Sequence, residues 1–132
     1  MKIITSLAIG LLTISLSTAA HAGPREDIIQ SFKAQGAVAG DATRGERLFT
    51  TKFGQGKPET PSCTTCHGGT PFSSGETRTG KVIEPMAVSK TPGRYTDPKK
   101  VAKWFRRNCN SVLGRECTAQ EKVDFLTYMS NQ

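Results

Sequence analysis

Residues 63–67 read Cys-Thr-Thr-Cys-His, so two cysteines stand three positions apart and a histidine follows the second one directly. This spacing is typical of covalent haem attachment, in which Cys63 and Cys66 each add to one vinyl group of the porphyrin. His67 then reaches the iron from one face of the ring. The motif predicts one covalently bound haem c, and it raises the question of which group lies on the other face.

Two other chemistries use cysteines with this spacing. A structural zinc site needs four ligands, but Cys109 and Cys117 lie eight positions apart instead of the usual two to four. A thioredoxin-like redox pair lies where a strand runs into a helix, and no alternating strand pattern precedes Cys63. Irregular zinc binding and thiol redox chemistry are therefore kept as alternatives to haem attachment.

The N-terminal segment has the organisation of a secretory signal peptide. Lys2 supplies a positive start, residues 3–16 form a short apolar run, and Ala20-His21-Ala22 matches a signal-peptidase site. A membrane anchor is the rival interpretation, although this run is short and interrupted by Thr and Ser. We expect residues 1–22 to be removed after Ala22 and residues 23–132 to form one monohaem domain in the periplasm.

Export changes how the remaining residues are interpreted. Removal of residues 1–22 takes His21 away and leaves His67 as the only histidine of the mature chain. In an oxidising compartment unprotected thiols tend to pair. With Cys63 and Cys66 bound to haem, the simplest outcome is a disulfide between Cys109 and Cys117. We interpret it as a structural staple between two helices, with a redox-active role as the alternative.

The pattern of apolar residues predicts helices and long loops. The chain has 132 residues, enough for one domain, with 13 glycines, seven prolines and 7% aromatic residues. Helices are expected over residues 24–35, over 42–53 after an Asp41 cap, over 97–108 with Asp97 as the cap, and from a Thr118 capping box to about residue 129. Residues 54–96 are expected to be mostly loop. Such a long loop needs a large apolar group to wrap around, which a haem supplies.

The sixth iron ligand has few candidates in the sequence. Met86 and Met129 are the methionines that remain after export. A methionine thioether is the usual partner of histidine in cytochromes c. Met129 falls at helical spacing in the last predicted helix, so core packing suits it better. Met86 is the stronger candidate, and Lys103 would first have to lose its proton.

Several segments resemble one known family. GDATRGERLF (40–49) followed by CTTCH and an amphipathic C-terminal helix is similar to the class I cytochrome c layout. GKVIEPMA (80–87), RYTDPKKVAKWFRRNCNSVLGREC (94–117) and TAQEKVDFLTYM (118–129) resemble the small oxygen-binding cytochromes c with an asparagine haem ligand, the SHP haem proteins. A sister family, the cytochromes c″, has a histidine at that ligand position. The resemblance covers nearly the whole mature chain.

The resemblance carries specific expectations. It implies an all-α, small class I cytochrome c fold in which helices and long loops surround one covalent haem. It implies that Asn108, in the RNCN stretch, faces His67 across the iron. Without the resemblance, Asn108 would be interpreted as a helix C-cap or turn residue. It also implies another cytochrome, dihaem or membrane-bound, as electron donor.

Two functions follow from the identity of the sixth ligand. A weak, labile ligand such as Asn108 would open the distal site on reduction to O2 or NO, and a role as a terminal oxidoreductase would then follow. Two strong ligands, with Met86 as the sixth, would instead make a plain electron-transfer cytochrome. Whether the protein is an enzyme stays open between these alternatives.

Positive charge dominates the chain, with 18 Lys and Arg against 11 Asp and Glu. No nucleic-acid motif is present, and we expect no nucleic-acid partner for an exported protein. We expect instead an acidic redox partner or a membrane surface, with simple solubility as the alternative. The helix over 97–108 is the best candidate patch, with Lys99, Lys100, Lys103, Arg106 and Arg107. Arg78 and Lys81 are candidates to pair with the haem propionates.

Overall fold

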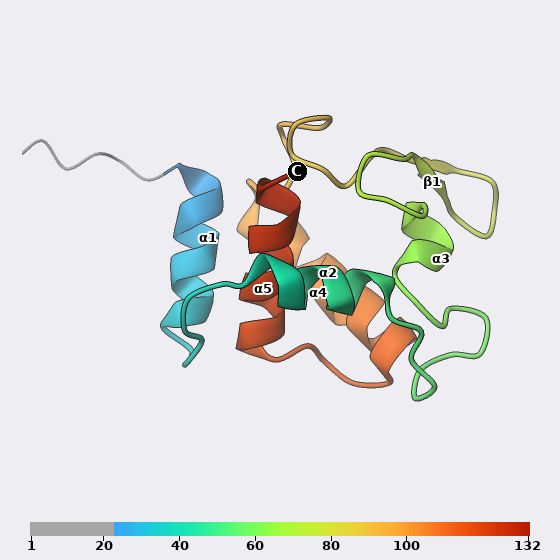
Figure 1. Ribbon diagram of the computed structural model, residues 1–132, viewed down its shortest axis with the longest axis horizontal. Helices are drawn as coiled ribbons and strands as arrows, with labels where there is room; N and C mark the ends of the chain where they lie inside the picture. Colours follow the sequence, from blue (N-terminus) through green and yellow to red (C-terminus); the bar gives the residue numbers. More distant parts are fainter. Residues whose placement is uncertain (1–22) are drawn as a thin grey trace, which may run out of the picture.

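The computed structural model describes residues 23–132, and the predicted signal peptide, residues 1–22, lies outside the described residues. The helices are α1 (Pro24–Lys33), α2 (Ala42–Thr50), α3 (Thr64–His67), α4 (Pro98–Leu113) and α5 (Ala119–Ser130). Two short antiparallel strands, β1 (Gly75–Glu76) and β2 (Val82–Ile83), form the sheet of this part of the chain. The all-α expectation is confirmed apart from this hairpin (Figure 1). Within residues 23–132, none of the helices is long and apolar enough to cross a membrane.

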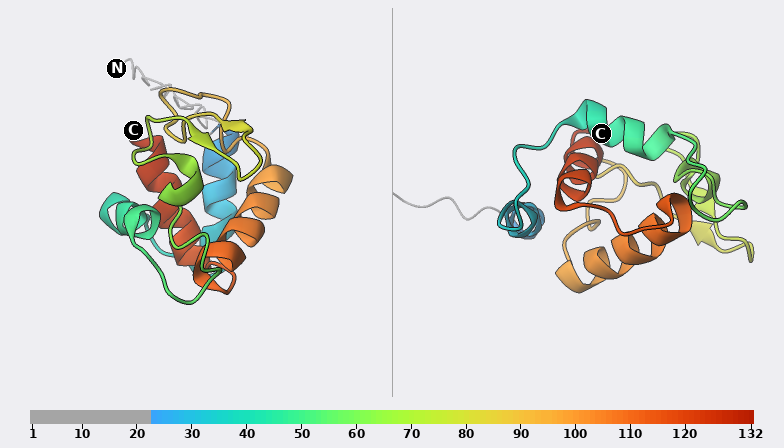
Figure 2. Two further views of the ribbon diagram at one scale, coloured as in Figure 1. Left: turned by 90° about the vertical axis from the view of Figure 1, so that its right-hand side faces the viewer. Right: turned by 90° about the horizontal axis from the view of Figure 1, so that it is seen from below.

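The centre of the fold is the crossing of α2 and α5. Figures 1 and 2 show α2 on one side of α5 and α4 on the other. At the crossing Gly45 lies directly against the carbonyl of Asp124 and the Cβ of Tyr128, where a side chain on residue 45 would collide. This close approach buries Phe49 of α2 and Leu126 of α5 completely. The crossing of these two helices is the arrangement that the class I cytochrome c resemblance implies.

Aromatic side chains join α1 and α4 to α5. Phe105 of α4 packs edge-on against Phe125 of α5, with 5.5 Å between ring centroids, and against Phe32 of α1 at 6.1 Å. Ile28 and Ile29 complete the buried face of α1. Such edge-to-face pairs add about 1 kcal/mol each to the burial of the rings. The first predicted helix is confirmed, although it ends at Lys33 instead of residue 35.

Helix α4 is longer than predicted. Asp97 caps its start through hydrogen bonds from the N–H groups of Lys99 and Lys100, as expected. It does not end at residue 108 but continues to Leu113, and Gly114 ends it with a φ of 69°. This left-handed conformation favours glycine after the last helical turn. The interpretation of Asn108 as a C-cap is therefore wrong, because Asn108 lies inside the helix.

The other predicted helices differ less. Helix α2 begins after Asp41, whose side chain accepts a hydrogen bond from the N–H of Arg44, but it ends at Thr50 instead of residue 53. Helix α5 has the predicted capping box, in which Thr118 and Glu121 each accept from the other's backbone N–H. These end signals are local, so they could be read from the sequence.

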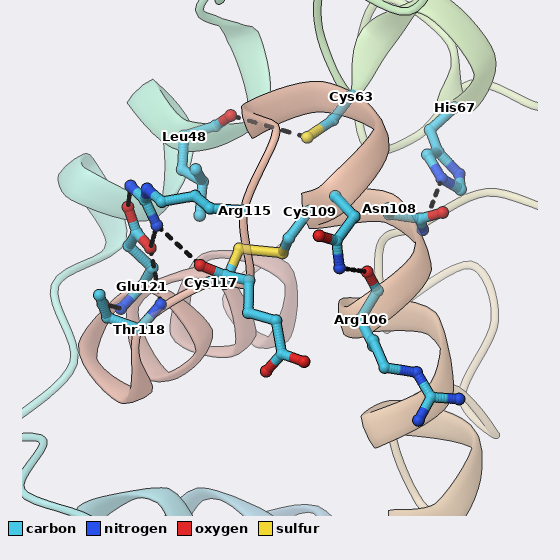
Figure 3. Close-up of a disulfide and its surroundings, with 12 residues drawn as sticks. Leu48, Cys63, His67, Arg106, Asn108, Cys109, Arg115, Cys117, Thr118 and Glu121 are labelled. Atoms are coloured by element: carbon cyan, nitrogen blue, oxygen red, sulfur yellow. Dashed lines mark hydrogen bonds and ion pairs between the residues drawn. A yellow bond between two sulfur atoms is a disulfide. The ribbon is translucent and has the colours of Figure 1, made fainter. Parts of the chain in front are cut away.

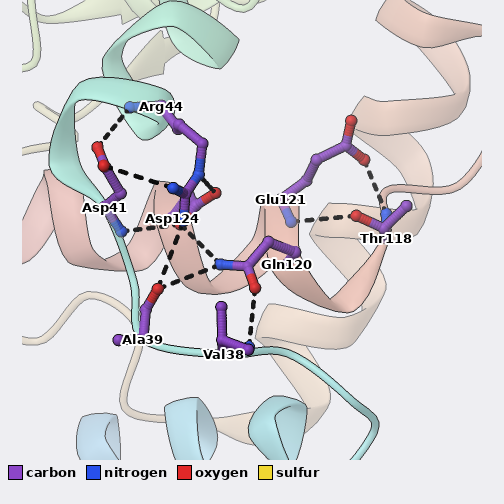
Figure 4. A network of polar contacts seen from close by, with 8 residues as sticks. All are labelled: Val38, Ala39, Asp41, Arg44, Thr118, Gln120, Glu121 and Asp124. Carbon is purple, nitrogen blue, oxygen red and sulfur yellow. Dashed lines mark hydrogen bonds and ion pairs between the residues drawn. The ribbon is translucent and has the colours of Figure 1, made fainter.

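A buried carboxylate fixes how α2 sits on α5. Asp124 of α5 is 3% exposed and accepts hydrogen bonds from Arg44 Nε at 2.7 Å, from the Asp41 N–H at 2.8 Å and from Gln120 at 2.9 Å (Figure 4). Burial alone would raise the pKa of Asp124, but these hydrogen bonds outweigh it and hold the pKa below its ordinary value. The network connects the loop before α2, the first turn of α2 and the middle of α5.

Replacing Asp124 with asparagine is expected to lower the free energy of unfolding by about 2 kcal/mol at pH 7, because Arg44 loses its buried partner. A depressed pKa stabilises the fold above the unfolded value of about 3.9, and this contribution is lost as pH falls through the folded value. The difference from wild type should therefore shrink below about pH 4. Chemical unfolding of the holoprotein at several pH values measures it. Asp27→Asn, on an exposed residue of α1, is the matched control, and an equal effect of both would contradict the prediction.

Candidate haem-binding site

The Cys-Thr-Thr-Cys-His motif, in a segment predicted to be mostly loop, forms the short helix α3 with Cys63 at its N-cap. Ser62, which is buried, bonds through its hydroxyl to the hydroxyl of Thr64 at 2.6 Å and so closes the start of the turn. The β1–β2 hairpin packs on the other side, where Gly75 lies against the backbone of Cys66 and His67 so closely that no side chain would fit. The hairpin thus holds the motif in place. Gly75 and Gly80 were the features of the sequence that could have indicated a tight turn after the motif.

Both cysteines of the motif are free thiols in the structure. Cys63 Sγ is half-buried and donates a weak hydrogen bond to the Leu48 carbonyl at 3.7 Å (Figure 3). Burial raises the pKa of Cys63 to about 11, so it is a neutral thiol at neutral pH. Cys66 is also half-buried and unpaired. Two unpaired thiols three residues apart, with a histidine directly after the second, are the groups that covalent haem attachment requires.

The imidazole of His67 is held in its neutral form. Burial, and secondarily the charge of Arg94, lower its pKa to about 4. Its Nδ1 is buried without a hydrogen-bond partner among the described residues. Neutral imidazole is the form that ligates metals, so His67 is ready to bind an iron through a ring nitrogen.

Asn108 faces His67 from the opposite helix. Its Nδ2 lies 3.5 Å from His67 Nε2, although 41 positions separate the two residues in sequence (Figure 3). This distance is at the limit of a hydrogen bond, so the contact is weak and a metal ion could compete for Nε2. Because the two ends of an amide have nearly the same shape, the oxygen can take the place of the nitrogen by a simple flip. The residues assigned to the two faces of the iron are therefore neighbours in space.

The predicted disulfide between Cys109 and Cys117 is confirmed. It joins α4 to the turn before α5, with 5.5 Å between the two Cα atoms. Both cysteines are buried and pack with Val112 and Leu113. The disulfide was expected to tie the end of one helix to the start of the next. Cys109 instead lies within α4, about one turn before the end of the helix. The pairing also leaves no third and fourth thiolate for zinc, so that alternative is wrong.

The described residues give no support to the remaining alternatives for the motif. The segment between α2 and Cys63 contains no strand, so the strand-to-helix setting of a thioredoxin-like pair is missing there. Residues 23–132 also hold no group of three or more His, Cys, Asp or Glu side chains that could bind a metal ion. A covalently attached haem is the group that fits two free thiols beside a neutral, half-buried imidazole.

The two methionines occupy different surroundings. Met129 is fully buried in the core, as predicted. Met86 is also buried, and its Sδ lies 3.9 Å from the hydroxyl of Tyr95, which donates to the Met86 carbonyl at 3.0 Å. Tyr95 has a φ of 62°, in the left-handed region that residues other than glycine seldom adopt. Sequence reasoning missed Tyr95, because nothing in the pattern signals a positive φ at a tyrosine.

Arg94 is a second residue that the sequence did not single out. Its Nε donates to the Pro85 carbonyl at 2.6 Å, and its own carbonyl accepts from Arg25 of α1 at 3.0 Å. Its positive charge contributes to the lowering of the His67 pKa. Of the two basic residues expected to pair with propionates, Arg78 is exposed and pairs with Glu59 at 2.9 Å, and Lys81 is exposed.

Comparisons with known proteins agree on the family. Residues 35–129 match the model of a domain family described as a domain of unknown function, DUF1924. The cytochrome c-type protein SHP of Cereibacter sphaeroides is 50% identical over 105 residues, which cover 80% of this chain and 81% of that protein. Cytochrome c″ of Methylophilus methylotrophus is 35% identical over 88 residues, 66% of this chain and 61% of that protein.

Solved structures give the same result. The structure of oxidised SHP, an oxygen-binding cytochrome c, superposes with a TM-score of 0.77 at 51% identity, covering 82% of this chain and 96% of that one. Oxidised cytochrome c″ from Methylophilus methylotrophus superposes with a TM-score of 0.69 at 30% identity, over 83% of this chain and 94% of that one. The cofactor of the present protein is haem c, and Cys63 and Cys66 fit the attachment of that group. From its sequence and its fold, this chain belongs to the family of SHP-type cytochromes c.

Proposed function

We propose that this protein is an exported monohaem cytochrome c whose distal site binds small diatomic ligands after reduction. Cys63 and Cys66 hold the haem through thioether bonds, His67 is the proximal iron ligand, and Asn108 is a labile sixth ligand. The observation that carries the proposal is the approach of the Asn108 amide to within 3.5 Å of His67 Nε2. The two groups face each other, and a small outward shift of the side chains would place them on the two sides of a single metal ion.

The chemistry of the ligands explains the lability. The haem supplies an iron that changes oxidation state and can bind a diatomic molecule at an open position. The amide of Asn108 is a weak, neutral ligand, and it suits the harder ferric ion better than the softer ferrous ion. Asn108 should therefore stay in place in the oxidised protein and move away on reduction. The SHP relative is described as oxygen-binding, and a solution structure of the cytochrome c″ relative is described in terms of haem-ligand detachment.

A plain electron-transfer cytochrome, with Met86 as the sixth ligand, is the second candidate. The thioether of Met86 is the stronger ligand, but it is 6% exposed, belongs to the main hydrophobic core and contacts the Tyr95 hydroxyl. Asn108, in contrast, is presented to His67 by a regular helix that a disulfide anchors at the next residue. These contacts favour Asn108 over Met86.

The proposal includes a location and a partner. The organisation of residues 1–22 favours export to the periplasm with cleavage after Ala22, and haem attachment to bacterial cytochromes takes place there. Electrons would come from another cytochrome, acidic at the contact or membrane-bound, and the first half of α4 offers Lys99, Lys100 and Lys103 to it. A role as a terminal oxidoreductase for a diatomic substrate follows if this partner delivers electrons in succession.

The reduced holoprotein is expected to bind carbon monoxide readily, because Asn108 leaves the sixth position on reduction. Optical spectra of the dithionite-reduced protein before and after addition of CO measure this directly. The ferrous form without CO should be high-spin, and its Soret band should shift and sharpen when CO is added. A low-spin ferrous protein that does not react with CO would return this chain to the electron-carrier class.

A further inference from the structure

A cavity of about 500 Å³ adjoins Asn108 on the outer flank of α4. Trp104, Arg107, Asn108, Asn110 and Ser111 of α4 line it together with Lys57 from the loop after α2. The lining includes the proposed sixth ligand but none of the attachment cysteines and not His67. The cavity therefore belongs to the Asn108 side of the site, and it is open to solvent, because four of its six lining residues are exposed.

The loop that carries Lys57 is held against α4 by two hydrogen bonds and a close backbone contact. The N–H of Lys57 donates to the Ser111 carbonyl at 2.7 Å, and the Thr60 hydroxyl bonds to the Ser111 hydroxyl at 2.9 Å. Gly56 lies directly against the Ser111 and Val112 carbonyls, where a side chain would not fit. The backbone position of Lys57 relative to α4 is thus fixed, and only its side chain is free to move.

Every charged group in the lining is positive. Arg107 lies over the indole of Trp104, with 5.5 Å from the guanidinium carbon to the ring centroid, which restrains both side chains. Neither Arg107 nor Lys57 forms an ion pair among the described residues, and no acidic side chain lines the cavity. The indole N–H of Trp104 adds a neutral donor. Such a set of unpaired cations and a neutral donor is what a small anion requires.

We propose that this cavity binds small inorganic anions and raises their concentration beside Asn108, so that anionic ligands reach the iron faster than neutral ligands of similar size. The inference rests on the proposed role of Asn108 as a displaceable ligand. A haem propionate is the other possible source of a small anionic group at Lys57 and Arg107. The experiments below separate an added anion from this internal one.

The first experiment detects an anion in the cavity without any reaction at the iron. Trp104 is the single tryptophan of the chain, so its indole N–H gives one resonance in a ¹H–¹⁵N spectrum of the ferric holoprotein. Nitrate, a poor iron ligand, is titrated at constant ionic strength. We expect a saturable shift of this resonance in the wild type that is lost in a Lys57→Gln/Arg107→Gln variant. A Lys90→Gln variant, which removes an exposed charge outside the cavity, should respond like the wild type. No shift in the wild type would overturn the inference.

The second experiment compares association rates at the ferric iron by stopped flow, with azide as the anionic ligand and nitric oxide as the neutral one. Removing both cavity charges should slow azide about three- to tenfold and leave nitric oxide unchanged, and higher salt should reduce the difference. An equal loss in Lys90→Gln would indicate a general charge effect and contradict the proposal. A shift in reduction potential with equal slowing of both ligands would assign the two cations to a propionate, and would also overturn it.

These results separate the inference from the function on which it rests. A reduced wild-type protein that fails to bind CO contradicts the labile Asn108, whatever the cavity variants do. Normal CO binding combined with an azide rate that does not depend on Lys57 and Arg107 contradicts only the anion site.

Discussion

Replacing Asn108 with alanine is expected to change the ferric optical and EPR spectra and to raise the affinity of the ferric protein for azide about tenfold or more. The reason is that an external ligand then no longer competes with the amide for the sixth position. The fold should tolerate the change, because Asn108 lies inside α4 and alanine is the better helix former by several tenths of a kcal/mol. Spectra and an azide titration of the ferric holoprotein provide the measurement.

Met86→Leu is the matched control for this experiment. Leucine nearly conserves the buried volume of Met86 and lacks the sulfur, so packing is kept while any iron ligation is removed. We expect its ferric spectrum to equal that of the wild type. If Met86→Leu changes the spectrum and Asn108→Ala leaves it unaltered, the assignment of the sixth ligand is reversed and the electron-carrier function is favoured.

Removing both thiols of the motif is expected to abolish covalent haem binding. In a Cys63→Ser/Cys66→Ser variant no thioether can form, so acid–acetone should extract all of the haem, and mass spectrometry should find the bare chain. The wild type should keep one haem through the same treatment. The effect is close to all-or-none because the two thiols are the only free ones among the described residues.

The single variants sharpen this result. Cys63→Ser and Cys66→Ser should each keep a haem through one remaining bond, in reduced yield. Retention of haem by the double variant after acid–acetone would contradict attachment at these positions. So would a wild-type protein that releases its haem, or one that contains zinc instead.

Local signals in the sequence predicted the helices but not all of their ends. The capping box at Thr118 and the Asp97 cap are patterns of adjacent residues, and the structure confirms both. The predicted helix ended at residue 108, but α4 continues through Asn108 and Asn110, although asparagine is a poor helix former. Burial of Val112 and Leu113 against the disulfide carries the helix on to Gly114. At this helix end, tertiary packing outweighs the low helix propensity of asparagine. No local sequence pattern predicts such packing.

Some residues of the candidate site could be predicted from the sequence and others could not. The attachment motif is contiguous, so Cys63, Cys66 and His67 could be recognised from spacing alone. The approach of Asn108 to His67 joins residues 41 positions apart, and only resemblance to a family suggested it. The settings of Arg94 and Tyr95 depend on carbonyl groups of the loop at residues 84–86 and on a positive φ, which composition and periodicity do not encode.

The disulfide that follows Asn108 has a consequence for ligand exchange. Cys109 is bonded to Cys117, and Gly56 packs directly against the Ser111 carbonyl of α4. The backbone at Asn108 therefore has little freedom to move. A displaced amide can then turn away only by rotation about its own side-chain bonds, and it stays within reach as a tethered competitor at high effective concentration. An external ligand binds with its intrinsic affinity multiplied by the fraction of open molecules, so a form that is open about 1% of the time binds about a hundredfold more weakly. With Asn108 as the proposed sixth ligand, this anchoring would leave the oxidation state of the iron as the main control on whether the distal site binds an external ligand.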